Sequence, residues 1–196
     1  MQLLMSWAGI LIMASYYNES QVGVFNAIVR ISTFSNIMIL AINSITSPRI
    51  ASAFASGNPG EMKKLSMEAS RLIMFSSLPI FLVLFLFPHF ILSIFGKDFT
   101  GHEDALMLLL GGQLFVAFAG LPSQILNMTG RERILRTNAV ISAFVNIVCC
   151  LLLIPTYGIM GASIAQVAGM LVWNILSILS VKKEFHFNAF FHFRKS

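Results

Sequence analysis

The sequence predicts an all-α, polytopic integral membrane protein with six transmembrane helices. Hydrophobic residues make up 57% of the 196 residues and charged residues only 11%. Soluble domains carry about 25% charge, so this chain has too few charges to cover a surface facing water. The apolar residues also fall into six long segments, and the cations are segregated between alternate connections.

Each of the six segments is compared with the length needed to cross a bilayer, which is about 20 apolar residues for ~30 Å of hydrocarbon. The first segment has no charged residue. The second is interrupted only by Arg30, and the third is free of charge but contains Pro79 and Pro88. The predicted spans are residues 1–18, 21–47, 72–95, 105–129, 137–154 and 159–181. We treat residues 1–196 as a single transmembrane domain.

The distribution of Lys and Arg predicts the orientation of these spans. Eleven of the thirteen cations lie in the loop 48–71, in the connection after the fourth span, and in the tail 182–196. The other connections hold only Lys97, and Arg30 lies within a span. Because cytoplasmic loops carry an excess of Lys and Arg, both termini, the loop and the tail are predicted to be cytoplasmic.

The loop 48–71 is predicted to contain a helix of its own. Asn58 is a preferred N-cap residue, and Pro59 suits the first helical position. The stretch GEMKKLSMEASRLIMF then continues without a break into the third span. Its cations serve either as ordinary positive-inside anchors or as contacts to anionic headgroups.

The second span has a polar stripe on one side of the predicted helix. At about 100° per residue, its polar side chains fall within an arc of roughly 140°. The polar stripe consists of Asn26, Arg30, Thr33, Asn36, Asn43, Ser44 and Ser47. One face of this helix therefore suits lipid, and the other suits a wet cavity or a neighbouring helix.

Three interpretations of Arg30 remain open at this point. The side chain can snorkel to the outer interface, brace a carbonyl on another helix, or face a cavity and meet an anion. An arginine at depth costs about 2.5 to 3.5 kcal/mol on insertion scales unless it finds water or a partner. Guanidinium suits phosphate because its planar fork donates two hydrogen bonds to two oxygens.

Several other classes of protein are excluded by what the chain lacks. The predicted spans contain no Asp or Glu, and no Ser/His/Asp, HExxH, CxxC or P-loop pattern occurs, so we predict no enzyme, no metal and no cofactor. The adjacent Cys149 and Cys150 fit neither a disulfide framework nor a metal site. Despite a net charge of +5, the segregation of cations by loop argues against nucleic-acid binding.

Three stretches in order resemble one known family. They are SQVGVFNAIVRISTFSNIMILAINSITSPRIASAFASG (20–57), LNMTGRERI (126–134) and LLLIPTYGIMGASIAQ (151–166). Together on a frame of six spans they are similar to the C-terminal half of bacterial polysaccharide flippases, in the multidrug/oligosaccharidyl-lipid/polysaccharide exporter superfamily. The similarity covers essentially the whole chain.

The resemblance implies a fold and an activity. Members of this family have twelve or more helices in two lobes around a central cavity, and are thought to alternate between inward- and outward-facing forms. They carry lipid-linked oligosaccharide units, usually on undecaprenyl diphosphate, across the inner membrane for O-antigen, capsule or exopolysaccharide assembly. Arg30 matches the arginine of the family's VGxYxxAxR-like stretch, and Arg49 matches that of its PR stretch. With the buried polar residues, the candidate substrate-binding set is Arg30, Asn26, Asn36, Asn43, Arg49, Gln113 and Asn127.

The chain departs from this family in having only six predicted spans, so it is expected to form one lobe. Its expected partners are the lipid-linked oligosaccharide, membrane lipids, and either a separate N-terminal half chain or a second copy. Two alternatives stay open: half of a multidrug or toxin extrusion transporter, and a truncated fragment that inserts without transporting.

Overall fold

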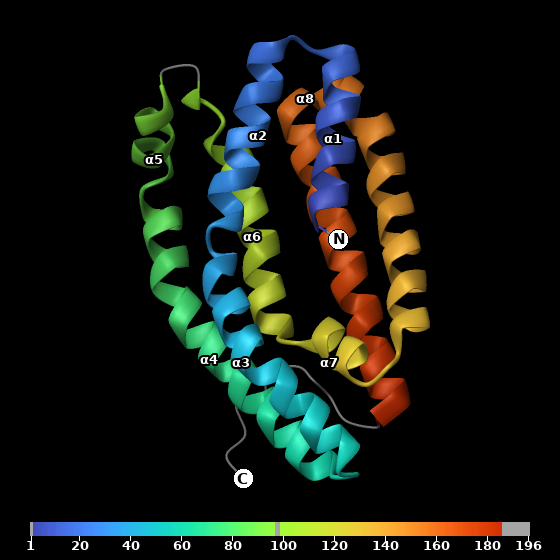
Figure 1. Cartoon of the computed structure of the whole chain (residues 1–196). Helices are drawn as coiled ribbons and strands as arrows, with labels where there is room; N and C mark the ends of the chain where they lie inside the picture. The colour runs from blue at the N-terminus through green and yellow to red at the C-terminus, as the bar shows by residue number, and fades with distance from the viewer. Residues whose placement is uncertain (1, 97–98, 186–196) are drawn as a thin grey trace.

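The computed structural model describes residues 2–96 and 99–185, so the tail from 186 onward and Lys97 lie outside the described residues. The regular elements of this part are helices, as the predicted all-α class requires. They are α1 (Gln2–Tyr16), α2 (Glu19–Thr33), α3 (Asn36–Ala55), α4 (Pro59–Leu86), α5 (Pro88–Phe95), α6 (Glu103–Ala119), α7 (Pro122–Met128) and α8 (Glu132–Phe185). Figure 1 shows them as an elongated bundle of helices that run up and down.

Three of these helices are long and apolar enough to cross a membrane by themselves, namely α3, α4 and α8. The bent pair of α6 and α7, with an angle of 50° between its members, makes a fourth candidate span. The helix α1 is apolar but shorter than a full span. The structure thus supports three to four membrane-spanning helices, and the predicted six crossings remain a prediction.

The lower number arises because the predicted spans are divided or merged. The predicted span 21–47 is shared between α2 and α3, and the predicted span 72–95 is interrupted at Phe87, ahead of Pro88. Conversely, α8 contains both of the last two predicted spans.

The helix α8 reverses direction at Gly158, so its two arms pack against each other (Figure 1). Gly158 has φ 55° and ψ −126°, a backbone conformation that residues with a Cβ atom rarely adopt. Asn146 Nδ2 on the first arm donates to the Ala165 carbonyl on the second at 3.0 Å, and Asn138 Nδ2 donates to Ser180 Oγ at 3.3 Å. These contacts between the arms identify α8 as a helical hairpin.

The break between α2 and α3 coincides with the sequence Ser32-Thr33-Phe34-Ser35. The Oγ atoms of Ser32 and Ser35 donate to the carbonyls of Val29 and Ser32 at 2.8 Å, and Thr33 Oγ1 donates to the Arg30 carbonyl at 2.9 Å. Hydroxyls that bond to carbonyls in the preceding turn compete with the backbone ladder and bend helices. Phe34 N bonds to the Ile31 carbonyl, three residues back, so the last turn of α2 is tightened.

The helix predicted inside the loop 48–71 is confirmed. Asn58 Oδ1 accepts a hydrogen bond from Glu61 N at 3.1 Å, and Pro59 is the first residue of α4. Because α3 continues past Pro48 to Ala55, little of the expected loop is irregular. The packed ends of α3 and α4 extend below the rest of the bundle in Figure 1.

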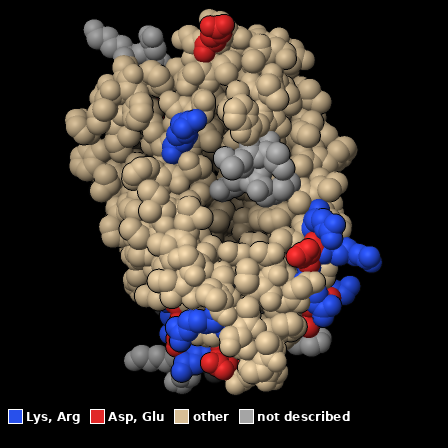
Figure 2. Space-filling model, viewed as in Figure 1, with Lys and Arg blue, Asp and Glu red and all other residues tan. Residues whose placement is uncertain are grey.

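Large apolar side chains cover the outside of the bundle as well as its core. Phe25, Ile28, Leu106 and Leu110 are fully buried, whereas side chains such as Leu86 are largely exposed. A soluble protein rarely exposes so many contiguous apolar groups, but a bilayer accommodates them. Figure 2 shows the Lys and Arg side chains gathered at the lower end, with one cation isolated among uncharged residues higher up.

Candidate functional site

A cavity of about 790 Å³ lies on one side of the bundle, between α1, the α2–α3 pair, the α6–α7 junction and the second arm of α8. We call it the lobe cavity. It is lined by Met5, Ser6, Trp7, Ile10, Asn26, Val29, Arg30, Thr33, Asn36, Ile39, Leu40, Asn43, Val116, Gly120, Leu121, Ser123, Gln124, Met170, Trp173 and Asn174. Figure 2 shows a hollow in the middle of the viewed face. Its volume lies in the usual range of small-molecule sites, which is about 300 to 1,000 Å³.

The cavity lies beside two interruptions of the helices. One is the break between α2 and α3 after Thr33, and the other is the sharp turn at Gly120, where φ is 75° and ψ is −129°. Leu121 then leads into Pro122, which cannot continue the hydrogen-bond ladder of α6. The bend of 50° between α6 and α7 leaves space beside it that a straight helix would fill.

Most of the predicted polar stripe lines this cavity. Asn26 and Arg30 come from α2, Thr33 ends it, and Asn36 and Asn43 come from α3. The stripe therefore continues across the break between the two helices. Its remaining members, Ser44 and Ser47, do not line the cavity: Ser44 is exposed and Ser47 is buried.

Arg30 is exposed and lines the lobe cavity. Along the axis of α2 it lies about 16 Å from Glu19, the first residue of that helix, at a rise of about 1.5 Å per residue. Its Nε donates to Asn26 Oδ1, one turn earlier on the same helix, at 3.2 Å. Among the described residues, no carboxylate forms an ion pair with it. The two terminal nitrogens are thus available to an anion.

The other predicted site residues do not line the lobe cavity. Arg49 is exposed on α3, and Asn127 is exposed on α7. Gln113 is only 1% exposed on α6, where it already has an interaction partner. The structure therefore brings together four of the seven candidates, Arg30, Asn26, Asn36 and Asn43. The other three, Arg49, Asn127 and Gln113, lie outside the cavity lining.

The structure adds two tryptophans and two amides that were not among the seven candidate site residues. Trp7 comes from α1, and Trp173 and Asn174 come from the second arm of α8. Gln124 comes from α7. The sequence Gly120-Leu121-Pro122 could have predicted the break between α6 and α7, because glycine and proline interrupt helices. Side chains beside such a break can face a cavity.

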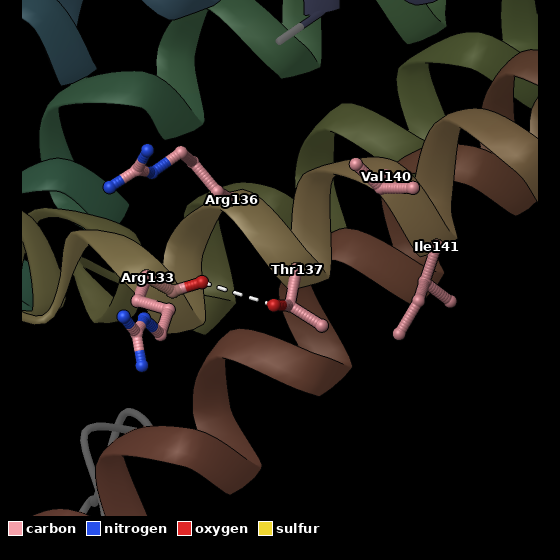
Figure 3. A pocket seen from close by; sticks show the side chains of 5 residues that line it. All are labelled: Arg133, Arg136, Thr137, Val140 and Ile141. Atoms are coloured by element: carbon pink, nitrogen blue, oxygen red, sulfur yellow. Dashed lines mark hydrogen bonds between the residues drawn. The ribbon is translucent and has the colours of Figure 1, made fainter.

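A second, shallower hollow of about 430 Å³ lies near the start of α8 and is shown in Figure 3. Its lining comes from one helix: Arg133, Arg136, Thr137, Val140 and Ile141. Thr137 Oγ1 donates to the Arg133 carbonyl at 3.1 Å, and the two guanidinium groups point in different directions. This divergence suits contact with a surface better than enclosure of one ligand.

Two contacts between ionisable side chains link helices away from the lobe cavity. His89 Nδ1 lies 2.8 Å from Glu103 Oε1, between the start of α5 and the start of α6. Arg131 Nε lies 2.9 Å from Glu184 Oε2, which ties the connection before α8 to the end of its second arm. The described residues contain no group of three His, Cys, Asp or Glu that could hold a metal ion.

Comparisons with known proteins place this architecture in a family. The family described as MatE matches residues 1–152. The uncharacterized membrane protein MJ1068 of Methanocaldococcus jannaschii is 30% identical over 128 residues, which are 63% of this chain and 25% of that protein. The probable low-salt glycan biosynthesis flippase Agl15 of Haloferax volcanii is 21% identical over 187 residues, or 92% of this chain and 40% of that protein.

The chain thus spans between a quarter and two fifths of the length of these curated relatives. No solved structure matches it significantly. The family match covers more than half of the chain, and the bundle carries helices long and apolar enough for a bilayer. The chain belongs to the MatE family, within the multidrug/oligosaccharidyl-lipid/polysaccharide exporter superfamily.

Proposed function

We propose that this chain is one lobe of a flippase that moves lipid-linked oligosaccharide units across the membrane for the assembly of surface polysaccharide. The carrier is a polyprenyl diphosphate, which is undecaprenyl diphosphate in bacteria. The proposal draws on the distant similarity to a protein named as a glycan biosynthesis flippase, and on the composition of the lobe cavity.

The observation that carries the proposal is the position of Arg30. Its guanidinium group is open to a cavity lined by both amide and apolar side chains, and among the described residues no carboxylate neutralises it. A diphosphate offers several oxygens to such a planar fork, in a setting of reduced dielectric where the attraction is stronger than in water. The apolar lining residues, among them Val29 and Leu40, suit the first isoprene units of the carrier.

The proposed mechanism is alternating access by rocking of two lobes. This chain supplies one wall of the path, and a separate N-terminal half chain or a second copy supplies the other. The lobe lies in the plasma membrane with both termini in the cytoplasm. The breaks in α2–α3 and α6–α7 provide segments whose angle can change without loss of the hydrogen bonds within each helix.

The first test compares two arginines of the predicted site in a complete, active transporter. Arg30→Ala removes the anion partner and should lower surface polysaccharide about tenfold or more, whereas Arg30→Lys retains the charge and should retain part of the activity. Arg49→Ala is the matched control, because Arg49 is an exposed cation that does not line the cavity. Each variant is measured as surface polysaccharide at equal membrane expression.

Normal polysaccharide in Arg30→Ala would refute the assigned role of this residue. The activity itself is tested by complementation of a strain that lacks its flippase, with this chain alone and with this chain plus the N-terminal half of a related flippase. Rescue by either supports the flippase. If both insert correctly and neither rescues, the flippase proposal fails, and protection of cells against cationic drugs would then favour an extrusion transporter.

A further inference from the structure

We infer that the lobe cavity accepts an uncharged glycan, held by Trp7, Trp173 and a set of side-chain amides, with the negative charge of the ligand confined to the diphosphate at Arg30. This inference rests on the proposed function and narrows its substrate class. It distinguishes lipid-linked units built from neutral sugars from those that contain uronic or sialic acids.

The first observation is the placement of the tryptophans. The chain has two in total, and both line the same cavity although they are 166 positions apart in the sequence. Trp7 lies on α1 with 60% of its surface exposed, and Trp173 is partly exposed on the second arm of α8, against which α1 packs. An indole face stacks on the C–H face of a sugar ring, and its N–H donates to a hydroxyl. Two such groups therefore form a surface suited to sugar rings.

The second observation is the number of carboxamides around these rings. Asn26, Asn36, Asn43, Gln124 and Asn174 line the cavity, and each carries both a donor and an acceptor. Sugar hydroxyls also donate and accept, so amides match them without adding charge. Asn43 Oδ1 is buried without a hydrogen-bond partner, so this wall of the cavity contains an unsatisfied acceptor.

The third observation is the charge of the lining. Among the described lining residues, Arg30 is the one charged side chain, and Asn26 already orients it. A glycan with acidic sugars would place its carboxylates next to this wall of the cavity, where the described lining residues offer no second cation. Burial of an unpaired charge is strongly unfavourable, whereas a neutral glycan leaves Arg30 matched to the diphosphate alone.

The experiment uses the full chain in phosphatidylcholine nanodiscs, so that no sugar-based detergent competes. Three probes are titrated: farnesyl diphosphate, farnesyl diphosphate linked to N-acetylglucosamine, and farnesyl diphosphate linked to glucuronic acid. Because both tryptophans line the cavity, intrinsic fluorescence reports binding there without added labels. For the tryptophan variants, displacement of radiolabelled farnesyl diphosphate replaces the fluorescence signal.

The neutral conjugate is expected to bind about tenfold more tightly than farnesyl diphosphate, and the acidic conjugate no more tightly than farnesyl diphosphate. Trp7→Ala and Trp173→Ala should each remove most of the gain from the sugar, measured within each variant as the ratio of its affinities for the neutral conjugate and for farnesyl diphosphate. Trp7→Phe should restore part of the gain, since it keeps an aromatic face. Phe144→Ala is the control, because Phe144 is a 68% exposed aromatic residue outside the cavity lining.

The outcomes separate this inference from the function on which it rests. Arg30-dependent binding of farnesyl diphosphate with no gain from N-acetylglucosamine would overturn the inference and leave the flippase proposal intact. Tighter binding of the glucuronic acid conjugate, or an undiminished gain in both alanine variants, would also overturn it. If the folded chain binds none of the three probes, the lobe cavity is not a site for lipid diphosphates and both proposals fail.

Discussion

Arg30 shows how a single residue acquires its environment from the helix that carries it. The guanidinium bonds to Asn26, one turn away on α2, and lines the lobe cavity beside Thr33 of the same helix. Of the three interpretations that the sequence left open, the one in which Arg30 faces a cavity agrees with its place in the lining, and its contact with an anion stays a prediction. Its described hydrogen bond is to a neighbour on its own helix and not to a carbonyl of another helix. A spacing of four residues in the sequence was sufficient to predict that Asn26 and Arg30 share a face.

At the same scale, Gly161 is predicted to be intolerant of any side chain. A Cβ there would collide with the backbone carbonyl of Leu153, on the other side of the reversal at Gly158. Gly161→Ala should therefore destabilise the protein by about 1 to 3 kcal/mol, with a Tm lowered by about 2 to 4 °C for each kcal/mol. The measurement is thermal unfolding of the purified chain in detergent.

Gly111→Ala is the control for this prediction. A Cβ at Gly111 would meet no atom within 4 Å, and alanine is a better helix former than glycine, so Tm should stay constant or rise slightly. Equal losses of stability in the two variants would show that tight packing at the reversal of α8 is not the reason why residue 161 must be glycine.

At the scale of elements, the break between α2 and α3 is predicted to depend on three hydroxyls. Replacement of Ser32, Thr33 and Ser35 by alanine removes the side-chain bonds to the carbonyls of the preceding turn and should straighten the pair. Spin labels at Gly23 and Ser44, in a background without Cys149 and Cys150, would report the change. Their separation should lengthen toward about 32 Å, the value for one continuous helix.

Ser76→Ala provides a control for the spin-label measurement. Ser76 Oγ donates to the Leu72 carbonyl at 2.6 Å within the continuous part of α4, so its loss should leave the α2–α3 separation unchanged. An unaltered distance in the triple variant would mean that tertiary packing, and not the hydroxyls, sets the angle.

The elements also show what a sequence can and cannot predict about a site. The polar stripe was readable because residues on one helix face recur with a fixed period, and five of its members line the cavity. Gln113 lies outside the lining of this cavity, and the sequence could not reveal this because a buried amide between helices has the same local pattern as an amide that faces a cavity. Trp7 and Trp173 could not be linked in advance, since only the packing of α1 against α8 brings them to one surface.

At the scale of the whole molecule, the predicted orientation can be measured directly. The connection between α1 and α2 and the reversal of α8 lie at one end of the bundle, and the connections α3–α4 and α7–α8 lie at the other (Figure 1). A cysteine at Ser20 should react with a membrane-impermeant maleimide on intact cells. Cysteines at Lys63 and Arg133 should react only after permeabilisation, and labelling from the opposite sides would invert the topology.

The overall fold could be predicted in class but not in its count of long helices. The low content of charged residues indicated a membrane protein. In lipid, backbone N–H and C=O groups must form hydrogen bonds within the protein, and long apolar segments do so as helices. The predicted boundaries near Asn58 hold, since capping is a local property. Apolar runs do not reveal where hydroxyls at 32–35 or a glycine at 120 interrupt a helix, so spans that read as continuous are divided.

The reversal at Gly158 has a consequence for the biosynthesis of the protein. From Thr137 to Val181 the two arms of α8 carry no charged residue, and Asn138 and Asn146 are hydrogen-bonded across the hairpin. An apolar hairpin whose arms satisfy amides on each other can leave the translocon for lipid as one unit, without waiting for a neighbouring helix. The hairpin of α8 thus has the features of an independent insertion unit, against which α1, α6 and α7 pack.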